Sequence, residues 1–192
     1  MSSQPLIFLT PEQYLAAERK AERKSEYLNG EVFAMAGAGR WHSVITINLT
    51  SSLDNQLRMS PCQVHHTDMR VRVNPTGNYL YAYPDLSVVC GEPRFEDMQF
   101  DTLLNPKVVI EVLSPSTEQF DRRTKATLYR QLQSLEEYFL IAQDRIHVEH
   151  YTRQPSGDWS RSDSDRLDDV VELRSVGATL KLSDVYHRVA FQ

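Results

Sequence analysis

The feature that most constrains the fold of this chain is an acidic residue inside an apolar run. Residues 108–113 read Val-Val-Ile-Glu-Val-Leu, a pattern typical of a strand buried on both faces. Glu111 interrupts this run, and an ionised carboxylate there costs several kcal/mol unless a cation meets it. We therefore expect the fold to bring positive charge to Glu111, from a side chain or from a metal ion.

Asp85 is a second carboxylate that accompanies a buried strand. It lies in Tyr-Pro-Asp-Leu-Ser-Val-Val (83–89), directly before a run of strand-forming residues. An alternative interpretation is turn chemistry, since Pro-Asp pairs are common at turns. Two carboxylates on neighbouring strands repel each other unless a cation lies between them. Asp85 and Glu111 together therefore indicate a site for a divalent metal.

Lys125 lies on a helix predicted over 118–133. Asp121, Lys125, Leu128 and Leu132 recur at spacings of four, three and four, so they share one stripe of that helix. The leucines are expected to face the sheet, which points the acid and the lysine the same way. The alternative is a solvent-exposed i,i+4 pair, which stabilises a helix by only a few tenths of a kcal/mol.

His42 begins the apolar stripe of another helix, predicted over 40–58. A lone histidine on an apolar face is more often a core residue than a ligand, and both interpretations stay open. Basic residues cluster twice, at Arg19, Lys20, Arg23 and Lys24, and at Arg122, Arg123, Lys125 and Arg130. The net charge of −5 differs from the basic excess usual for a protein that coats DNA.

The length of 192 residues, with 41% hydrophobic and 24% charged residues, predicts one α/β domain over 1–192, with its core at about 10–152. No apolar run approaches the roughly 18 residues of a membrane helix, and residues 1–10 lack the pattern of a signal peptide. We therefore expect a cytoplasmic protein in which Cys62 and Cys90 are reduced thiols.

The remaining patterns predict a mixed set of helices and short strands. Thr10-Pro11-Glu12 begins a helix expected to end near Arg23, and Asn29-Gly30 centres a hairpin over 26–33. Residues 91–106 are expected to form a long loop, and Ser116 or Thr117 to cap the helix that carries Lys125. Strands are expected at 63–66, 69–73, 79–82, 86–90, 107–113, 137–142 and 146–152, with a turn at 74–78, a weaker β segment after 158 and a helical turn at 183–188.

Several of these motifs together resemble the Uma2 family of restriction-endonuclease-like proteins. The resemblance rests on 83–89, on Val109-Ile110-Glu111-Val112-Leu113-Ser114-Pro115-Ser116-Thr117, and on Asp121-Arg122-Arg123-Thr124-Lys125 with Tyr129. Residues 26–31, 136–141 and His42 also match that family. The resemblance covers about 10–150.

The resemblance implies a branch of the PD-(D/E)XK nuclease superfamily, with a mixed central sheet flanked by helices and preceded by an N-terminal helix and hairpin. It implies that Asp85 and Glu111 bind Mg²⁺ or Mn²⁺ and that Glu26 adds a catalytic acid. The superfamily lysine normally lies two residues after the second acid, where this chain has Leu113. The resemblance implies that Lys125, on the following helix, is its counterpart here.

The resulting expectation is a metal-dependent endonuclease that hydrolyses phosphodiester bonds, with DNA as its partner. His42, Asp121 and Arg122 are expected on the substrate side of the site, with Asp121 also fixing the ammonium of Lys125. A first alternative is a catalytically silent nucleic-acid-binding or mobile-element accessory protein on the same scaffold. A second is an interaction module whose polar network only determines the fold. The oligomeric state stays open, with a homodimer as one alternative.

Overall fold

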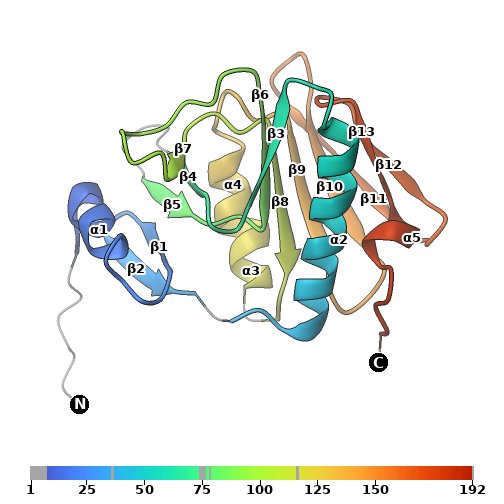
Figure 1. Ribbon diagram of the computed structural model, residues 1–192, viewed down its shortest axis with the longest axis horizontal. Helices are drawn as coiled ribbons and strands as arrows, with labels where there is room; N and C mark the ends of the chain where they lie inside the picture. The colour runs from blue at the N-terminus through green and yellow to red at the C-terminus, as the bar shows by residue number, and fades with distance from the viewer. Residues whose placement is uncertain (1–7, 36, 74–76, 78, 116, 192) are drawn as a thin grey trace.

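A six-stranded mixed sheet with helices on both faces forms the centre of the molecule (Figure 1). The computed structural model describes residues 8–35, 37–73, 77, 79–115 and 117–191. The sheet order is β11-β10-β9-β8-β6-β3. Its strands are β3 (Cys62–His66), β6 (Leu86–Cys90), β8 (Val108–Leu113), β9 (Glu137–Ala142), β10 (Val148–Arg153) and β11 (Trp159–Ser164).

The two strands predicted most strongly are neighbours in the middle of this sheet. β6 and β8 pair antiparallel, with Leu86 opposite Ile110 and Ser87 opposite Val109. β8 then pairs with β9 in parallel. Every residue of β8 is buried, as its apolar run predicted, and this includes Glu111 at 4% exposure.

One face of the central sheet is covered by α2 (Arg40–Leu57). Ile45, Leu49, Leu53 and Leu57 line its buried side and pack on alternate residues of the strands, so the predicted apolar stripe is confirmed. The hairpin of β12 (Val170–Leu173) and β13 (Ala178–Lys181), followed by α5 (Leu182–Val185), completes this layer.

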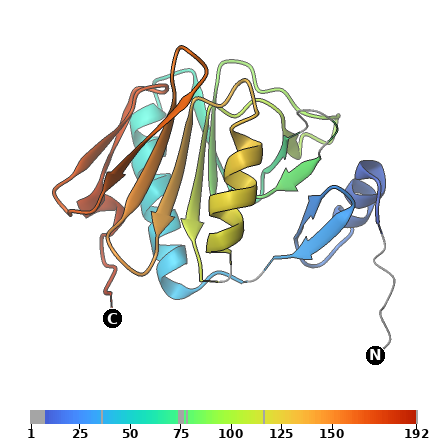
Figure 2. The same ribbon diagram turned by 180° about the vertical axis from the view of Figure 1, so that it is seen from behind.

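The opposite face is covered by the segment that carries Lys125 (Figure 2). The predicted single helix over 118–133 is divided into α3 (Glu118–Phe120), a π-helical turn η1 (Asp121–Lys125) and α4 (Ala126–Tyr129). Short π segments inside helices are rare and are found frequently at functional sites. Thr117 occupies the N-cap position without a side-chain capping bond, and Ser116 lies outside the described residues.

A second, five-stranded sheet of order β2-β1-β5-β4-β7 lies at the N-terminal side. Its strands are β1 (Ser25–Leu28), β2 (Glu31–Ala34), β4 (Arg70–Val73), β5 (Leu80–Ala82) and β7 (Thr102–Leu103). The tyrosines of α1 (Pro11–Glu18), β1 and β5 pack together, with Tyr14 stacked on Tyr27 at 5.1 Å. The hairpin around Asn29-Gly30 is confirmed, with positive φ at both turn residues.

Two details differ from the sequence predictions, and one prediction falls mostly on residues that the structure does not describe. α1 ends at Glu18, earlier than predicted, because the Glu18 carboxylate accepts hydrogen bonds from the backbone and hydroxyl of Ser25 and ties the chain into β1. The loop over 91–106 contains the short strand β7. The predicted turn at 74–78 lies mostly outside the described residues.

The two cysteines also differ from the prediction of reduced thiols, which is wrong for this structure. Cys62 on β3 and Cys90 on β6 are joined by a disulfide. They occupy directly opposite positions of an antiparallel pair, which brings their Cα atoms to 3.9 Å. None of the helices in the described part of the chain is long and apolar enough to span a membrane.

Candidate active site

The ammonium of Lys125 lies among three carboxylates on the helix-covered face opposite α2. Its Nζ is 2.8 Å from Glu26 Oε1, 3.2 Å from Asp121 Oδ1 and 3.3 Å from Glu111 Oε1. All four residues are at least nine-tenths buried. Lys125 therefore points inward, and the alternative of a solvent-exposed pair with Asp121 does not describe this structure.

Asp85 lies beside the same cluster, fixed from two sides. The ladder of β6 and β8, continued by one position, places it opposite Glu111 and on the same face of the sheet. Its Oδ2 accepts a hydrogen bond from the backbone N–H of Val112 at 2.7 Å, and its Oδ1 lies 3.2 Å from His42 Nε2. His42 thus faces the polar cluster from the first turn of α2.

Burial raises the pKa of Glu111 well above its usual range, because the charged form loses water. The ammonium of Lys125 opposes this shift, and the carboxylates of Asp121, Asp85 and Glu26 add to it. The Tyr129 hydroxyl donates to Glu111 Oε1 at 3.4 Å. The sequence motif contains Tyr129, but spacing alone gave it no role.

The pKa of Lys125 is also raised, but here neighbouring charges cause the shift and burial opposes it. Burial on its own lowers the pKa of this lysine, but the carboxylates of Glu111, Glu26 and Asp121 outweigh burial and raise it well above its usual value. The amine is therefore protonated at neutral pH, as a counter-ion for the acids around it.

The described side chains leave the cluster with an excess of negative charge. Four carboxyl groups, those of Glu26, Asp85, Glu111 and Asp121, face one ammonium and the imidazole of His42. Hard divalent cations such as Mg²⁺ prefer oxygen donors of this kind. The chemistry of this donor set therefore fits a hard divalent cation.

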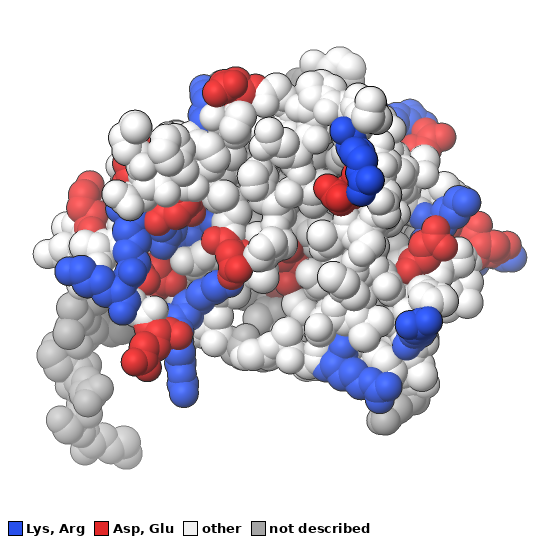
Figure 3. Space-filling view, viewed as in Figure 1, with Lys and Arg blue, Asp and Glu red and all other residues white. Residues whose placement is uncertain are grey.

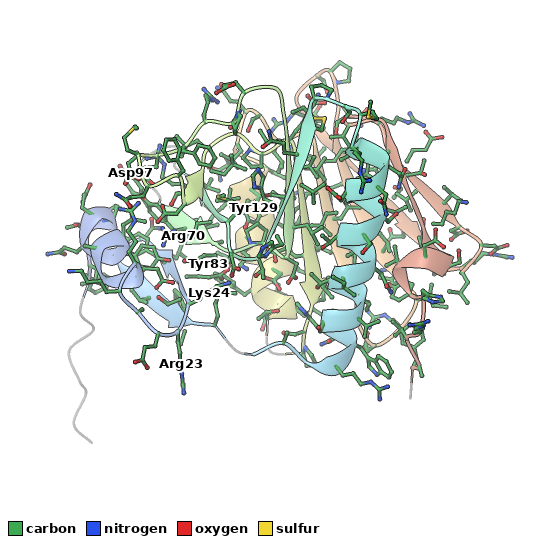
Figure 4. All side chains as sticks on the ribbon, viewed as in Figure 1. Arg23, Lys24, Arg70, Tyr83, Asp97 and Tyr129 are labelled. Atoms are coloured by element: carbon green, nitrogen blue, oxygen red, sulfur yellow. A yellow bond between two sulfur atoms is a disulfide. The ribbon has the colours of Figure 1, made fainter. Side chains whose placement is uncertain are left out.

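A second polar layer connects this cluster to the N-terminal sheet. Glu26 Oε1 accepts a hydrogen bond from the backbone N–H of Tyr83 at 3.1 Å, and the Tyr83 hydroxyl donates to Glu18 at 3.0 Å. Figure 4 shows Lys24 and Arg70 next to Tyr83 and Arg23 extending away from the molecule. The ammonium of Lys24 and the guanidinium of Arg70 lie 5.2 Å and 5.6 Å from the Tyr83 ring centroid.

Arg122 does not join the cluster around Lys125. Its guanidinium pairs with Glu118 at 2.8 Å and with the buried carboxylate of Glu149 on β10. Glu149 also contacts Arg161, at 3.3 Å. The structure thus brings Glu26, His42, Asp85, Glu111, Asp121 and Lys125 together and places Arg122 over the neighbouring strands.

Glu149 also belongs to a group of potential metal ligands that the sequence analysis missed. Ligand atoms of His147, Glu149 and Asp163 lie within 4.8 Å of one another. Arg122 and Arg161 place positive charge beside this group, as Lys125 does in the cluster around Glu111. Alternation along β10 and β11 would have placed these side chains on one face, but the register between the strands is not visible in the sequence.

Charges of both signs are interspersed at the end of the molecule that carries α1, whereas the face over α2 is mostly uncharged (Figure 3). Two basic side chains near α1 are paired: Arg19 contacts both Asp97 and Asp101 at 2.8 Å, and Lys24 pairs with Asp68. The visible surface therefore has no continuous basic stripe of the kind that tracks a nucleic-acid backbone over many nucleotides.

The fold and this cluster of buried acids around a lysine define a restriction-endonuclease-like α/β protein. A family model described as "Uma2: Putative restriction endonuclease" matches residues 11–183. The chain belongs to this family.

Two relatives and one solved structure extend the comparison. Uncharacterized protein slr1290 of Synechocystis sp. is 35% identical over 192 residues, which span 98% of this chain and 97% of that protein. Uncharacterized protein sll1609 of the same organism is 36% identical over 79% of this chain and 84% of its own length. The crystal structure of a "putative nuclease belonging to DUF820" from Anabaena variabilis has a TM-score of 0.73 at 20% identity, covering 95% of this chain and 99% of that one, which confirms the predicted fold class.

Proposed function

We propose that this protein is a metal-dependent nuclease that hydrolyses phosphodiester bonds in DNA. The observation that carries the proposal is the cluster of Glu26, Asp85, Glu111 and Asp121 around Lys125, buried on one face of the central sheet. Family membership and the nuclease-like fold support the same class of reaction.

Asp85 and Glu111 are the residues proposed to hold Mg²⁺ or Mn²⁺, with Glu26 as an additional acid. A bound divalent ion would polarise a phosphoryl oxygen and lower the pKa of a coordinated water. The protein holds Asp85 ready for this role, because the backbone N–H of Val112 fixes one carboxylate oxygen. His42, which contacts the other oxygen at 3.2 Å, orients the carboxylate from α2.

Lys125 is proposed to stabilise negative charge that develops on the phosphate. Its ammonium is protonated and is held from the helix side by Asp121 at 3.2 Å. Positioned cations in a water-poor site are effective at this task because they need no reorganisation during the reaction. Arg122 is not assigned to the substrate, since its guanidinium pairs with Glu118 and Glu149.

The test is a cleavage time course on supercoiled plasmid and single-stranded DNA with Mn²⁺ or Mg²⁺, using the wild type, Asp85→Asn and Asp97→Asn at equal concentration. Asp97 is a matched control, because it pairs with Arg19 on the surface, outside the cluster. We expect cleavage by the wild type and by Asp97→Asn, and a loss of at least a hundredfold with Asp85→Asn, a typical scale for removing one essential group.

A silent scaffold makes the opposite prediction in the same experiment. The wild type would then leave both DNA substrates uncut in either metal, while a gel-shift assay with the same DNA would still detect binding. That outcome would replace the nuclease proposal by a nucleic-acid-binding role.

A further inference from the structure

A cavity of about 490 Å³ lies on the face of the central sheet opposite to Lys125. It opens between strands β10 and β11 on one side and the β12–β13 hairpin on the other. Its lining residues are Glu137, His150, Thr152, Gln154, Ser160, Ser162, Ser164, Val170, Val171, Glu172 and Arg174. This volume is in the range of small-molecule sites, roughly 300–1,000 Å³. The proposed nuclease reaction uses none of these residues.

The floor of the cavity is a buried acid–imidazole pair. His150 Nε2 lies 2.6 Å from Glu137 Oε2, and the two residues are 9% and 1% exposed. The other oxygen of Glu137 accepts a hydrogen bond from the backbone N–H of Ser175 at 2.7 Å. The ring of Phe139 stacks on the imidazole with centroids 4.1 Å apart. The imidazole is therefore held in a fixed orientation beneath the opening.

Hydroxyl groups form the wall above this pair. The register of β10 and β11 places Ser160 opposite Thr152 and Ser162 opposite His150, and Ser164 follows on the same face. Cross-strand neighbours have Cβ atoms roughly 4.5–5.5 Å apart, so the Ser162 hydroxyl stands next to the imidazole. Within the described part of the chain, the hydroxyls of Ser162 and Ser164 make no side-chain hydrogen bond, so both are available to a ligand.

The charges in the cavity are already compensated. The two oxygens of Glu137 are hydrogen-bonded to His150 Nε2 and to the backbone N–H of Ser175, and Glu172 pairs with Arg174 at 3.0 Å. An anionic ligand would meet two carboxylates, and a cation would meet an arginine and an imidazole. The serine and threonine hydroxyls of the lining are neutral and can donate or accept a hydrogen bond. A neutral ligand can bind to them without an electrostatic penalty.

We propose that this cavity binds a neutral, polyhydroxylated small molecule through Ser162 and Ser164, above the buried pair of His150 and Glu137. Hydroxyls that both donate and accept match the serine and threonine side chains, and Val170 and Val171 offer apolar contact to carbon atoms of the ligand. Two sources share this chemistry: a free sugar and the ribose of a nucleoside.

The experiment titrates the intact protein with maltose, adenosine and 2′,3′-dideoxyadenosine and follows backbone amide shifts by NMR. Ser162→Leu fills the cavity from an exposed strand position, and Ser51→Leu makes the same change on the exposed side of α2. Thermal unfolding of both variants verifies that they fold. We expect maltose or adenosine to shift the amides of β10 and β11, with affinity at least tenfold lower in Ser162→Leu and unchanged in Ser51→Leu.

Binding of maltose identifies a free sugar as the ligand class. Binding of adenosine, together with loss of binding for its dideoxy analogue, identifies a ribose. The proposal is overturned if neither probe binds at millimolar concentration, if the dideoxy analogue binds as tightly as adenosine, or if Ser162→Leu binds like the wild type. None of these outcomes depends on cleavage of nucleic acid.

Discussion

The ammonium of Lys125 lies 2.8 Å from the carboxylate of Glu26, and this ion pair joins the helix on the central sheet to a strand of the N-terminal sheet. The same ammonium reaches Glu111 on β8 at 3.3 Å. Glu26 belongs to the N-terminal sheet and Glu111 to the central sheet, and both contact the same lysine. The packing of the two sheets therefore also assembles the site. Loss of the lysine should therefore affect both stability and chemistry.

Replacing Lys125 with alanine should lower the free energy of unfolding in metal-free buffer. The change leaves the buried acids Glu26, Glu111 and Asp121 without their shared cation, and breaking a buried pair in this way typically costs about 3–5 kcal/mol. Urea unfolding with EDTA and with Mn²⁺ measures the effect. We expect Mn²⁺ to restore part of the loss, since a divalent ion can replace the ammonium among the carboxylates.

Lys107→Ala is the matched control for this prediction. Lys107 pairs with Glu136 at 3.3 Å, with both side chains substantially exposed, so its loss should cost less than about 1 kcal/mol. Equal costs for the two alanine variants would show that the pairs of Lys125 contribute no more than a surface ion pair.

Glu111→Gln should raise stability at neutral pH in metal-free buffer. Burial raises the pKa of Glu111 in the folded protein above the unfolded value of about 4.3, so the folded state holds the proton more tightly. The free energy of unfolding of the wild type therefore decreases as the pH rises above that unfolded value, because the folded state binds more protons there. Glu111→Gln lacks this ionisable group and this decrease. Unfolding curves from acidic to neutral pH measure the difference, with the exposed Glu92→Gln as control.

A divalent ion should reverse this order of stability, because it favours the ionised carboxylate. If the wild type and Glu111→Gln instead change in parallel with pH, the buried acid is not the source of the dependence.

His42 should titrate with a raised pKa that depends on Asp85. Burial lowers the pKa of this imidazole, but the hydrogen bond and charge of Asp85 outweigh burial. The pair therefore stabilises the fold below the unfolded histidine pKa of about 6.5 and loses this contribution as the pH rises through the folded value. Asp85→Asn removes the two largest influences that raise this pKa, so the pKa should fall relative to that of the wild type. NMR titration of the imidazole in wild type, Asp85→Asn and Asp97→Asn measures this change.

Local patterns in the sequence predicted the central elements well. The apolar run at 108–113, the stripe of α2 and the Asn29-Gly30 turn depend on periods of two and 3.6 residues and on turn chemistry, and each has the predicted form. The orientation of Lys125 followed from the same logic, since its stripe continues through Leu128.

Features that depend on strand register could not be predicted from the sequence. The pairing of β3 with β6 alone places Cys62 opposite Cys90, and the pairing of β10 with β11 alone groups His147, Glu149 and Asp163. The π-helical turn η1 likewise has no local signal, because its intervals resemble those of an ordinary helix. Arg122 was expected on the substrate side of the site, whereas its guanidinium pairs with Glu149 on β10.

Replacing Arg122 with alanine should lower stability and leave metal binding unchanged. Glu149, 1% exposed, would lose one cation but keep Arg161 at 3.3 Å and the Tyr151 hydroxyl at 2.8 Å. A buried charged group that loses one of several partners typically costs about 1–3 kcal/mol.

Urea unfolding and Mn²⁺ calorimetry of Arg122→Ala, with Arg161→Ala as its counterpart on the same carboxylate, separate the two interpretations of Arg122. A structural partner of Glu149 gives a similar loss of stability in both variants, with Mn²⁺ affinity and cleavage rate per folded molecule unchanged. If Arg122→Ala instead keeps wild-type stability and loses cleavage, the guanidinium leaves Glu149 for the substrate. Arg122 would then act on the phosphate, because a planar guanidinium can bind two phosphate oxygens at once.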